Sequence, residues 1–273
     1  MQIYVLMDNL ATPNFACEHG LSLLIKTAHA KILFDMGQSD LYLENAKLLG
    51  ADIEDVDVAI ISHGHYDHGG GLQSFMYKNH RAPIYIHKEA FGKHFAARQC
   101  GEYSFIGIPP IFQESPQIIE VSRDLEILDG VLLFSSVKTD RFLSKSNDAL
   151  LVECLGRYQK DSFSHEQNLL VQENGKYVLF AGCAHCGIVN IIDRAMEIAG
   201  APMDAVIGGF HLSNPSTCQC EPIETIEQIA EYLLSYPTSY YTCHCTGMEA
   251  YQHLKSRMGN RIHYITAGTV MEI

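Results

Sequence analysis

Short apolar segments separated by polar turns dominate the first half of the chain and predict β-strands. Residues 2–8 (QIYVLMD), 21–27 (LSLLIKT) and 31–35 (KILFD) are such segments, and the three residues between the last two fit a hairpin turn. Residues 56–62 (VDVAIIS) form a continuous apolar run, typical of a strand buried on both faces. Residues 39–50 carry leucines at helical spacing and end on a glycine, which predicts a helix.

Strands and helices alternate in the second half, a pattern compatible with an α/β fold. Helices are expected over 187–200, 221–236 and 247–259. The first has an apolar stripe, and the second begins with Pro222 and acidic residues, which favour a helix N-terminus. One earlier helix is expected over 72–79. The remaining strands are expected at 82–88, 117–122, 125–136, 149–155, 168–174, 176–182, 204–210, 239–245 and 261–266.

Composition and charge narrow the class of protein. The 273 residues suit one large domain or two small ones, and 47% of them are apolar, which is enough for a substantial core. No apolar run approaches the roughly 18 residues of a membrane span, and the N-terminus lacks signal-peptide features. We therefore expect a cytoplasmic protein with no membrane span. The net charge of −13 argues against nucleic acid as a partner, but it is compatible with a small anionic substrate held by a local site.

The run ISHGHYDHGGG, residues 61–71, directly follows an apolar strand and is the strongest chemical signal in the chain. Side chains i and i+2 of a strand share one side, so His63 and His65 can point at one position past the strand end. Asp67 and His68 lie on the following turn and can point at a neighbouring position. Imidazoles with a carboxylate suit zinc, and also manganese or iron. Paired metals in hydrolytic centres lie about 3.5–4 Å apart. The three glycines would let the backbone pass close to a bound group.

The pattern H-x-H-x-D-H after an apolar strand resembles the signature of the metallo-β-lactamase superfamily. The stretches CEHGLSLLIKTAHAKILFDMG, GCAHCGIVN, GGFHL and CHCTG resemble, in that order, one branch of it. This is the branch of the methanopterin-pathway dihydropterin–aminobenzene ribofuranosyl-phosphate synthase-like proteins, many of whose bacterial members are known only as metal-dependent hydrolases. The resemblance implies one domain over residues 1–273 with a four-layer αββα sandwich. Two mixed β-sheets would pack face to face with helices outside and metals at one edge.

The resemblance also implies roles for residues beyond the first motif. Superfamily members commonly hold a metal-bridging aspartate where this chain has Cys183. This thiol is either a ligand, since zinc accepts sulfur, or a buried structural group. His185 resembles a histidine of the branch and would complete the site of His63 and His65. The commoner superfamily position for this third histidine precedes the strand, where His165 is the only candidate.

Two further histidines follow apolar strands late in the chain. His244, in CHCTG, resembles the last metal histidine of the superfamily, which would join Asp67 and His68. His211, in GGFHL, is expected to shuttle a proton or contact the substrate, with metal binding as the alternative. Asp67 is expected to accept a proton as well as to bind metal. His211 and Asp67 are therefore the catalytic candidates.

Three polar residues near the N-terminus are expected to support the site. Asp35 ends KILFD, and an acid at this position in the superfamily can orient a metal-binding histidine by accepting its free ring N–H. Glu18 and His19 match the EHG motif of the branch. They are expected beside the metals or the substrate, with an exposed polar turn as the alternative.

Residues 99–117 are rich in glycine, proline and aromatic residues, which predicts a loop that covers the pocket and selects the substrate. Five of its side chains are candidates to cover an aromatic substrate: Tyr103, Phe105, Ile108, Ile111 and Phe112. Five cations elsewhere are available to bind an anion: Lys88, Lys93, Arg98, Arg141 and Lys145. Two C-x-C pairs provide either thiols near the site or a four-thiol zinc site: Cys218, Cys220, Cys243 and Cys245.

The expected function is hydrolysis of an ester, lactone or phosphoester by metal-activated water. The expected partner is a small molecule, anionic or aromatic. A transferase is the alternative, because the resemblance implies that archaeal relatives join a dihydropterin pyrophosphate to an aminobenzene ribosyl phosphate, which would need the same ligands. A non-catalytic or redox metal-binding protein is a third hypothesis, against which the intact first motif argues.

Overall fold

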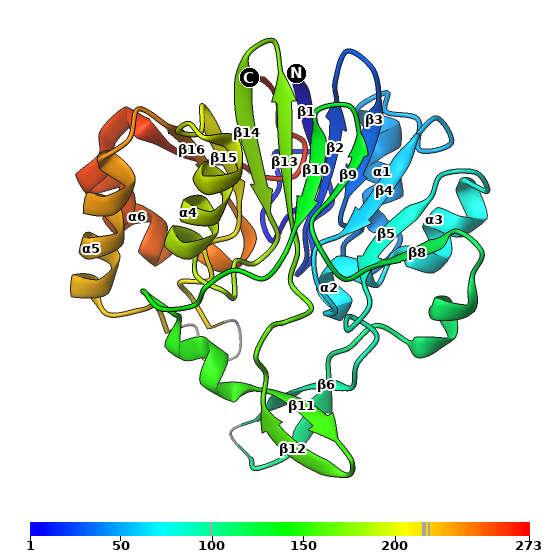
Figure 1. Ribbon diagram of the computed structural model, residues 1–273, viewed down its shortest axis with the longest axis horizontal. Helices are drawn as coiled ribbons and strands as arrows, with labels where there is room; N and C mark the ends of the chain where they lie inside the picture. Colours follow the sequence, from blue (N-terminus) through cyan, green and yellow to red (C-terminus); the bar gives the residue numbers. More distant parts are fainter. Residues whose placement is uncertain (99, 215–216, 218) are drawn as a thin grey trace.

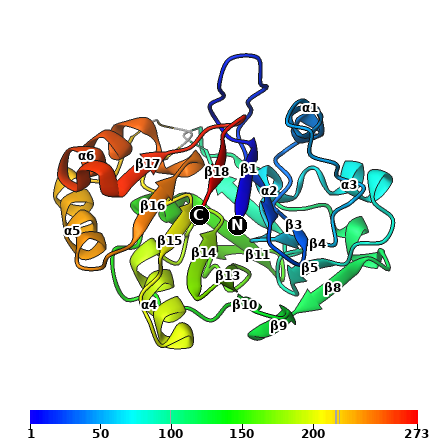
Figure 2. The ribbon, with the colours of Figure 1, turned by 90° about the horizontal axis from the view of Figure 1, so that it is seen from above.

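The computed structural model describes residues 1–98, 100–214, 217 and 219–273. Two seven-stranded sheets pack face to face, and helices cover their outer faces (Figure 1). This arrangement confirms the expected αββα sandwich. The chain ends lie side by side (Figure 2), where the Met1 amino group donates to the Ile273 carbonyl at 3.3 Å.

The first sheet joins an antiparallel half to a parallel half. In spatial order its strands are β18 (Val270–Glu272), β1 (Gln2–Met7), β2 (Ser22–Lys26), β3 (Lys31–Phe34), β4 (Val58–Ile61), β5 (Ile84–His87) and β8 (Ile118–Val121). Pairing is antiparallel from β18 to β3 and parallel from β3 to β8. The predicted hairpin is present as β2 and β3, with Leu23 opposite Phe34. Helices α1 (Leu41–Leu48) and α3 (Leu72–Lys78) cover the outer face.

The second sheet is built in the same way, with antiparallel pairing among its earlier strands, β9 to β14, and parallel pairing among its later ones, β14 to β17. In spatial order its strands are β17 (Ile262–Tyr264), β16 (Ser239–Thr242), β15 (Ala205–Gly208), β14 (Lys176–Ala181), β13 (Asn168–Glu173), β10 (Val131–Phe134) and β9 (Leu125–Leu128). The segment 125–136, expected as one strand, divides into the hairpin β9–β10, with Gly130 at φ 70° between them. Helices α4 (Ile188–Ala199), α5 (Ile223–Leu234) and α6 (Met248–Met258) cover this sheet.

Apolar side chains alternate between the two faces of each sheet and hold the layers together. In β14, Val178 and Phe180 belong to the cluster between the sheets, whereas Leu179 and Ala181 pack under the helices. Phe34 of the first sheet meets Phe180 with ring centroids 6.3 Å apart. The two-residue period of the strand therefore places one set of side chains in each layer of the core.

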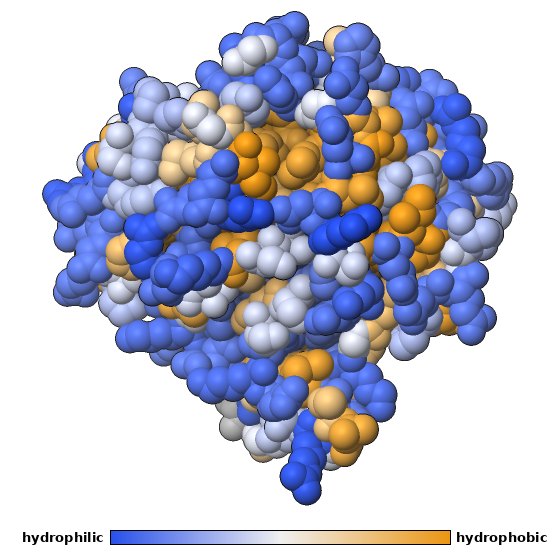
Figure 3. All heavy atoms as spheres, in the orientation of Figure 1, coloured by the Kyte–Doolittle hydropathy of each residue, from blue (hydrophilic) through white to orange (hydrophobic). Residues whose placement is uncertain are grey.

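A third, four-stranded sheet projects from the sandwich (Figure 1). In spatial order its strands are β12 (Arg157–Lys160), β11 (Leu150–Cys154), β6 (His94–Ala97) and β7 (Tyr103–Phe105). Only β11 was expected from the sequence. All four residues of β12 are exposed, so no burial pattern marked that strand. Apolar side chains gather on this projection (Figure 3), among them Leu155, which is 98% exposed.

Short helical turns connect several strands, and α2 and η3 among them carry candidate metal-binding residues. They are α2 (Tyr66–Gly69), η1 (Pro110–Glu114), η2 (Lys145–Ala149), η3 (His244–Thr246) and η4 (Gly259–Arg261). Within the residues that the structure describes, no helix is both long and apolar enough to cross a membrane. The assignment of residues 1–273 to one domain stays a prediction.

We expect Phe180→Ala to lower the free energy of unfolding by about 3–5 kcal/mol, because this ring is fully buried between the two sheets. Urea unfolding of the protein, after treatment with a chelator to remove metal, measures this free energy. Leu155→Ala is the control, and as an exposed substitution it should stay within about 0.5 kcal/mol of the parent. Equal losses in the two variants would contradict the packing of the sheets at Phe180.

Candidate metal centre

Four strands end at one edge of the sandwich, and candidate residues follow each end. His63 follows β4 of the first sheet, whereas Cys183, His211 and His244 follow β14, β15 and β16 of the second. These last three strands are parallel neighbours, so their carboxyl ends lie side by side. Ligand sites concentrate at such ends in α/β folds.

The glycines of the first motif make room for the protein's own backbone. A Cβ atom at Gly70 would lie 2.3 Å from the carbonyl oxygen of Gln38, and one at Gly71 would lie 2.3 Å from that of Met36. The expectation that these glycines lie against a bound group is therefore wrong for both positions. They let α2 pack against the loop after β3, which fixes where the side chains of the motif point.

His63, His65 and His185 form one cluster, which we call the three-histidine set. Their ring centroids lie 4.6–4.9 Å apart. The Nε2 atom of each ring is buried and has no hydrogen-bond partner among the described residues. Burial and the neighbouring imidazoles hold the pKa of each ring well below its usual value, so the rings are neutral. Buried imidazoles with unpartnered nitrogens match the nitrogen ligands of zinc.

Hydrogen bonds to the second ring nitrogen orient two of these rings. His63 Nδ1 lies 2.9 Å from Ser62 Oγ, and His185 Nδ1 lies 3.0 Å from Asn147 Oδ1. Because Ser62 Oγ donates to Asp35 Oδ2 at 2.7 Å, it accepts from His63, whose Nε2 keeps its lone pair. The amide oxygen of Asn147 imposes the same tautomer on His185. Ser62 and Asn147 were not predicted as part of the site. For Ser62 the available signal was its position directly before His63, the first residue of the motif.

Asp67, His68 and His244 form a second cluster, which we call the acid–histidine set. His244 Nε2 lies 3.2 Å from Asp67 Oδ2 and 3.3 Å from His68 Nε2. The outer nitrogens are again held, with His68 Nδ1 2.6 Å from Asp35 Oδ2 and His244 Nδ1 2.8 Å from Asn9 Oδ1. Asp35 thus contacts a candidate ligand in the way the resemblance implied. Asn9 was missed, because it follows the first strand without any motif.

Electrostatics also favour a cation at the acid–histidine set. Burial lowers the pKa of His68, but the carboxylates of Asp35 and Asp67 outweigh burial and raise it. Two carboxylates in a buried position require nearby positive charge. A divalent cation would satisfy that requirement and leave the imidazoles neutral.

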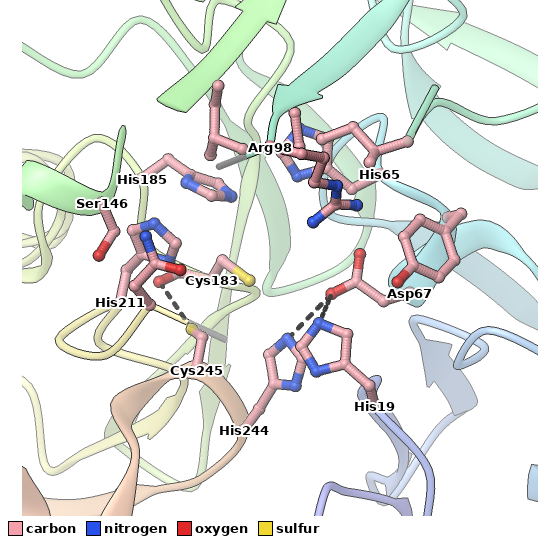
Figure 4. A pocket seen from close by; sticks show the side chains of 15 residues that line it. His19, His65, Asp67, Arg98, Ser146, Cys183, His185, His211, His244 and Cys245 are labelled. Carbon is pink, nitrogen blue, oxygen red and sulfur yellow. Dashed lines mark hydrogen bonds and ion pairs between the residues drawn. The ribbon is translucent and has the colours of Figure 1, made fainter. Parts of the chain in front are cut away.

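Cys183 lies between the two sets. Its sulfur shares one group of donor atoms, all within 4.8 Å of one another, with the acid–histidine set, and another with His63 and His185. Figure 4 shows this sulfur between His185 and His244. Burial raises the pKa of the Cys183 thiol well above its usual value, so a thiolate at this position depends on a bound cation.

His211 adjoins Cys183 and Cys245, and one donor atom from each of the three residues lies within 4.8 Å of the others. Both ring nitrogens of His211 are buried without a hydrogen-bond partner among the described residues. Its ring centroid lies 4.2 Å from that of His185. His211 can therefore exchange a proton with a molecule bound in the pocket.

The backbone around the centre is strained at four positions. Asp35, Ala184, His211 and His244 have left-handed φ values of 61°, 61°, 49° and 51°. This conformation costs roughly 1–2 kcal/mol for a residue with a Cβ. Such residues cluster at functional sites, where surrounding contacts hold them in place. One such contact is the 2.6 Å bond from the His244 amide to Asp8 Oδ1.

The remaining candidates divide between the pocket and its support. His19 Nε2 lies 3.2 Å from Asp67 Oδ2 and lines the pocket. Glu18 instead accepts hydrogen bonds from the amide and hydroxyl of Ser39, at 3.0 and 2.7 Å, so it supports the loop after β3.

His165, the alternative third histidine, uses both ring nitrogens in contacts within the protein. One accepts from the Gly64 amide and the other contacts Asp161. Its donor atoms group with those of His65, His94 and Asp161, whereas His185 groups with His63 and Cys183.

The two C-x-C pairs are not brought together as a four-thiol site among the described residues. Cys243 packs in the core between the sheets, whereas Cys245 lines the pocket. Cys220 is partly exposed, and Cys218 lies outside the described residues. Cys245 is thus the thiol of these pairs that lies beside the centre.

A pocket of about 600 Å³ opens onto both sets (Figure 4). The segment 99–117 contributes Ile106 to its wall, while Tyr103 and Phe105 are about half exposed and are not among the lining residues. A role of this segment in selecting substrate stays a prediction. The outer wall consists of His19, Tyr66, Ala96, Arg98, Ile106, Ser146, Leu150 and Asn214.

Comparison with known proteins agrees with this geometry. The family model described as the metallo-beta-lactamase superfamily matches residues 16–139. A protein of Methanocaldococcus jannaschii called 7,8-dihydropterin-6-methyl-4-(beta-D-ribofuranosyl)-aminobenzene-5'-phosphate synthase is 28% identical over 292 residues, covering 100% of this chain and 96% of that protein. An uncharacterised protein of the same organism, MJ0448, is 28% identical over 268 residues, covering 96% of each chain.

A solved structure agrees over the whole length. The crystal structure of Tm1679, described as a metal-dependent hydrolase of the beta-lactamase superfamily, is 30% identical with a TM-score of 0.82, and the match covers 100% of this chain and 99% of that one. Fold, motif and full-length similarity therefore agree, and this chain belongs to the metallo-β-lactamase superfamily.

Proposed function

We propose that this chain is a metal-dependent enzyme that hydrolyses an ester, lactone or phosphoester. The observation that carries the proposal is that Cys183 shares one group of buried donors with the acid–histidine set and another with His63 and His185, beside one pocket. The name of Tm1679, a metal-dependent hydrolase, supports the same reaction class.

The three-histidine set together with Cys183 would hold one ion, and the acid–histidine set together with Cys183 would hold a second. Both sets combine nitrogen with sulfur, and the second adds a carboxylate, which together suit zinc. A thiolate favours zinc over manganese, which prefers oxygen ligands. Iron is the alternative ion.

The residues around the ions would transfer protons and orient the imidazoles. When bound, the ions supply an activated water molecule and polarise the bond under attack. His211 lines the pocket with both ring nitrogens unpartnered among the described residues, so one of them can hold the proton that the leaving group needs. Asp67 is the second candidate to accept a proton, while Asp35, Ser62 and Asn147 orient the imidazoles.

A transferase is the second candidate function, favoured by the full-length similarity to the M. jannaschii synthase. Such a reaction would use the same donors to bind a leaving pyrophosphate. Supplying a dihydropterin pyrophosphate with and without an aminobenzene acceptor separates the two functions. Release of pyrophosphate only in the presence of the acceptor would favour the transferase over the hydrolase.

We expect His65→Ala to lower the zinc content of the purified protein sharply, because this imidazole is one of three buried nitrogen ligands. Inductively coupled plasma mass spectrometry measures the bound metal. His80→Ala is the control, since His80 is exposed, and its metal content should equal that of the parent. Unchanged metal content in His65→Ala would remove His65 from the ligand assignment.

We expect Cys183 to resist iodoacetamide in the zinc-loaded protein and to react after chelation, because a metal-bound sulfur is not available as a nucleophile. Mass-spectrometric mapping follows the labelling of each cysteine over time. Cys154 is exposed and should label at the same rate in both states. Equal labelling rates for Cys183 with and without metal would reject its role as a ligand.

We expect His211→Ala to lower kcat by about 10²–10⁴ for a substrate with a phenol leaving group, because general acid catalysis typically contributes that much. The loss should be far smaller for a 4-nitrophenol leaving group, which departs readily as an anion. Steady-state kinetics on paired phenyl and 4-nitrophenyl esters and phosphodiesters measure the contrast. The same loss with both leaving groups would show that His211 does not donate this proton.

A further inference from the structure

The five lysine and arginine residues that were candidates to bind an anion lie in different parts of the fold. Lys88 and Lys145 are exposed, Lys93 lies 3.2 Å from Glu153 on the third sheet, and Arg141 pairs with Asp193. Of the lysine and arginine side chains that the structure describes, the one that lines the pocket is Arg98. It is half-buried, at the end of β6.

Arg98 is held in place before any ligand arrives. Its backbone amide donates to the Glu102 carbonyl at 2.8 Å, and its carbonyl accepts from the Gly101 amide at 2.9 Å. The side-chain Nε donates to Ser104 Oγ at 3.0 Å. The two backbone contacts hold the chain at the turn between β6 and β7, and the third anchors the side chain at its Nε atom. Figure 4 shows the guanidinium extending into the pocket on the side of Asp67.

The positive charge of Arg98 lies in a protein that is otherwise strongly negative. The chain carries a net charge of −13, so its overall field repels anions rather than attracting them. The outer wall adds the hydroxyl groups of Tyr66 and Ser146 to the guanidinium, while Ala96, Ile106 and Leu150 are apolar. The polar part of this wall therefore offers hydrogen-bond donors beside the metal centre.

We propose that Arg98 binds a phosphoryl group of the substrate at the wall of this pocket, beside the bond that reacts. This inference rests on the proposed function and narrows its substrates from esters, lactones and phosphoesters to phosphorylated compounds. A guanidinium offers a planar pair of N–H donors that matches phosphate oxygens. An arginine beside metal ions is also a recurring arrangement for stabilising charge on phosphoryl groups. A neutral ester or lactone offers no charged oxygen to this guanidinium.

Binding of phenylphosphonate to the zinc-loaded protein, followed by isothermal titration calorimetry, tests the proposal without requiring turnover. We expect Arg98→Met to raise the Kd by about 10- to 100-fold, the usual effect of losing hydrogen bonds to a charged group. Arg98→Lys keeps the charge but not the planar pair of donors, so its Kd should lie between those of the parent and Arg98→Met. Arg157→Met is the matched control, since it removes the same charge from exposed strand β12 of the same sheet, and its Kd should equal that of the parent.

Three outcomes would overturn the proposal. The first is a Kd for phenylphosphonate in Arg98→Met equal to that of the parent, with the variant folded by circular dichroism and its zinc content unchanged. The second is an equal loss of affinity in Arg157→Met, which would indicate a general charge effect. The third is tighter binding of benzoate than of phenylphosphonate by the parent protein, which would identify a carboxylate site instead.

The same titration separates this inference from the proposed function. If the protein binds no zinc but Arg98→Met still weakens phenylphosphonate binding, the metal-dependent function fails and the anion site stands. If the protein is an active metal-dependent hydrolase and Arg98→Met binds phenylphosphonate as the parent does, the function stands and the anion site fails.

Discussion

Burial of imidazole nitrogens around the sulfur of Cys183 is the constraint on which the rest of the molecule depends. The Nε2 atoms of His63, His65 and His185 are buried with no partner among the described residues. A buried polar atom left unsatisfied costs about 1–3 kcal/mol, so packing alone does not account for three of them in one place. Cations held at this position would supply the missing partners.

The surrounding structure fixes one tautomer of the ligands. Ser62, Asn147, Asp35 and Asn9 each contact an Nδ1 atom, which leaves the Nε2 atoms directed at the centre. These four residues come from loops that follow different strands or precede them. The loops are held by the sandwich, whose two sheets pack through a continuous apolar core. The core thus determines the positions of the donors, and the left-handed backbone at His211 and His244 is the local strain that this requires.

The first motif could be recognised in the sequence because it leaves a local signal, and the αββα fold was then implied by the family resemblance that the motifs carry. Strand ends followed by histidines, and the spacing of His63 to His68, are visible within a few residues. The partners that orient the rings leave no such signal: Asn147 is 38 residues from His185, and Asn9 is 235 residues from His244. Three strands of the third sheet were missed for a different reason. β7 and β12 are short and largely exposed, and β6 alternates between buried and partly buried residues over four positions only, which is too short a pattern to mark a strand.

The third sheet is nevertheless joined to the metal centre through one buried carboxylate. Asp161 follows β12, and its Oδ2 accepts from His94 Nδ1 of β6 at 2.7 Å and from His165 Nε2 at 3.2 Å. Burial raises the pKa of Asp161, but the bonds from these two histidines outweigh burial and hold it well below its usual value, so the carboxylate is charged. His165 in turn accepts from the amide of Gly64 at 2.9 Å, between two of the proposed ligands. The sheet that carries Arg98 is therefore connected by hydrogen bonds to the loop that carries His63 and His65. A substrate held by both parts would meet a guanidinium and a metal centre in a fixed relation to each other, which is what positioning of a reacting group requires.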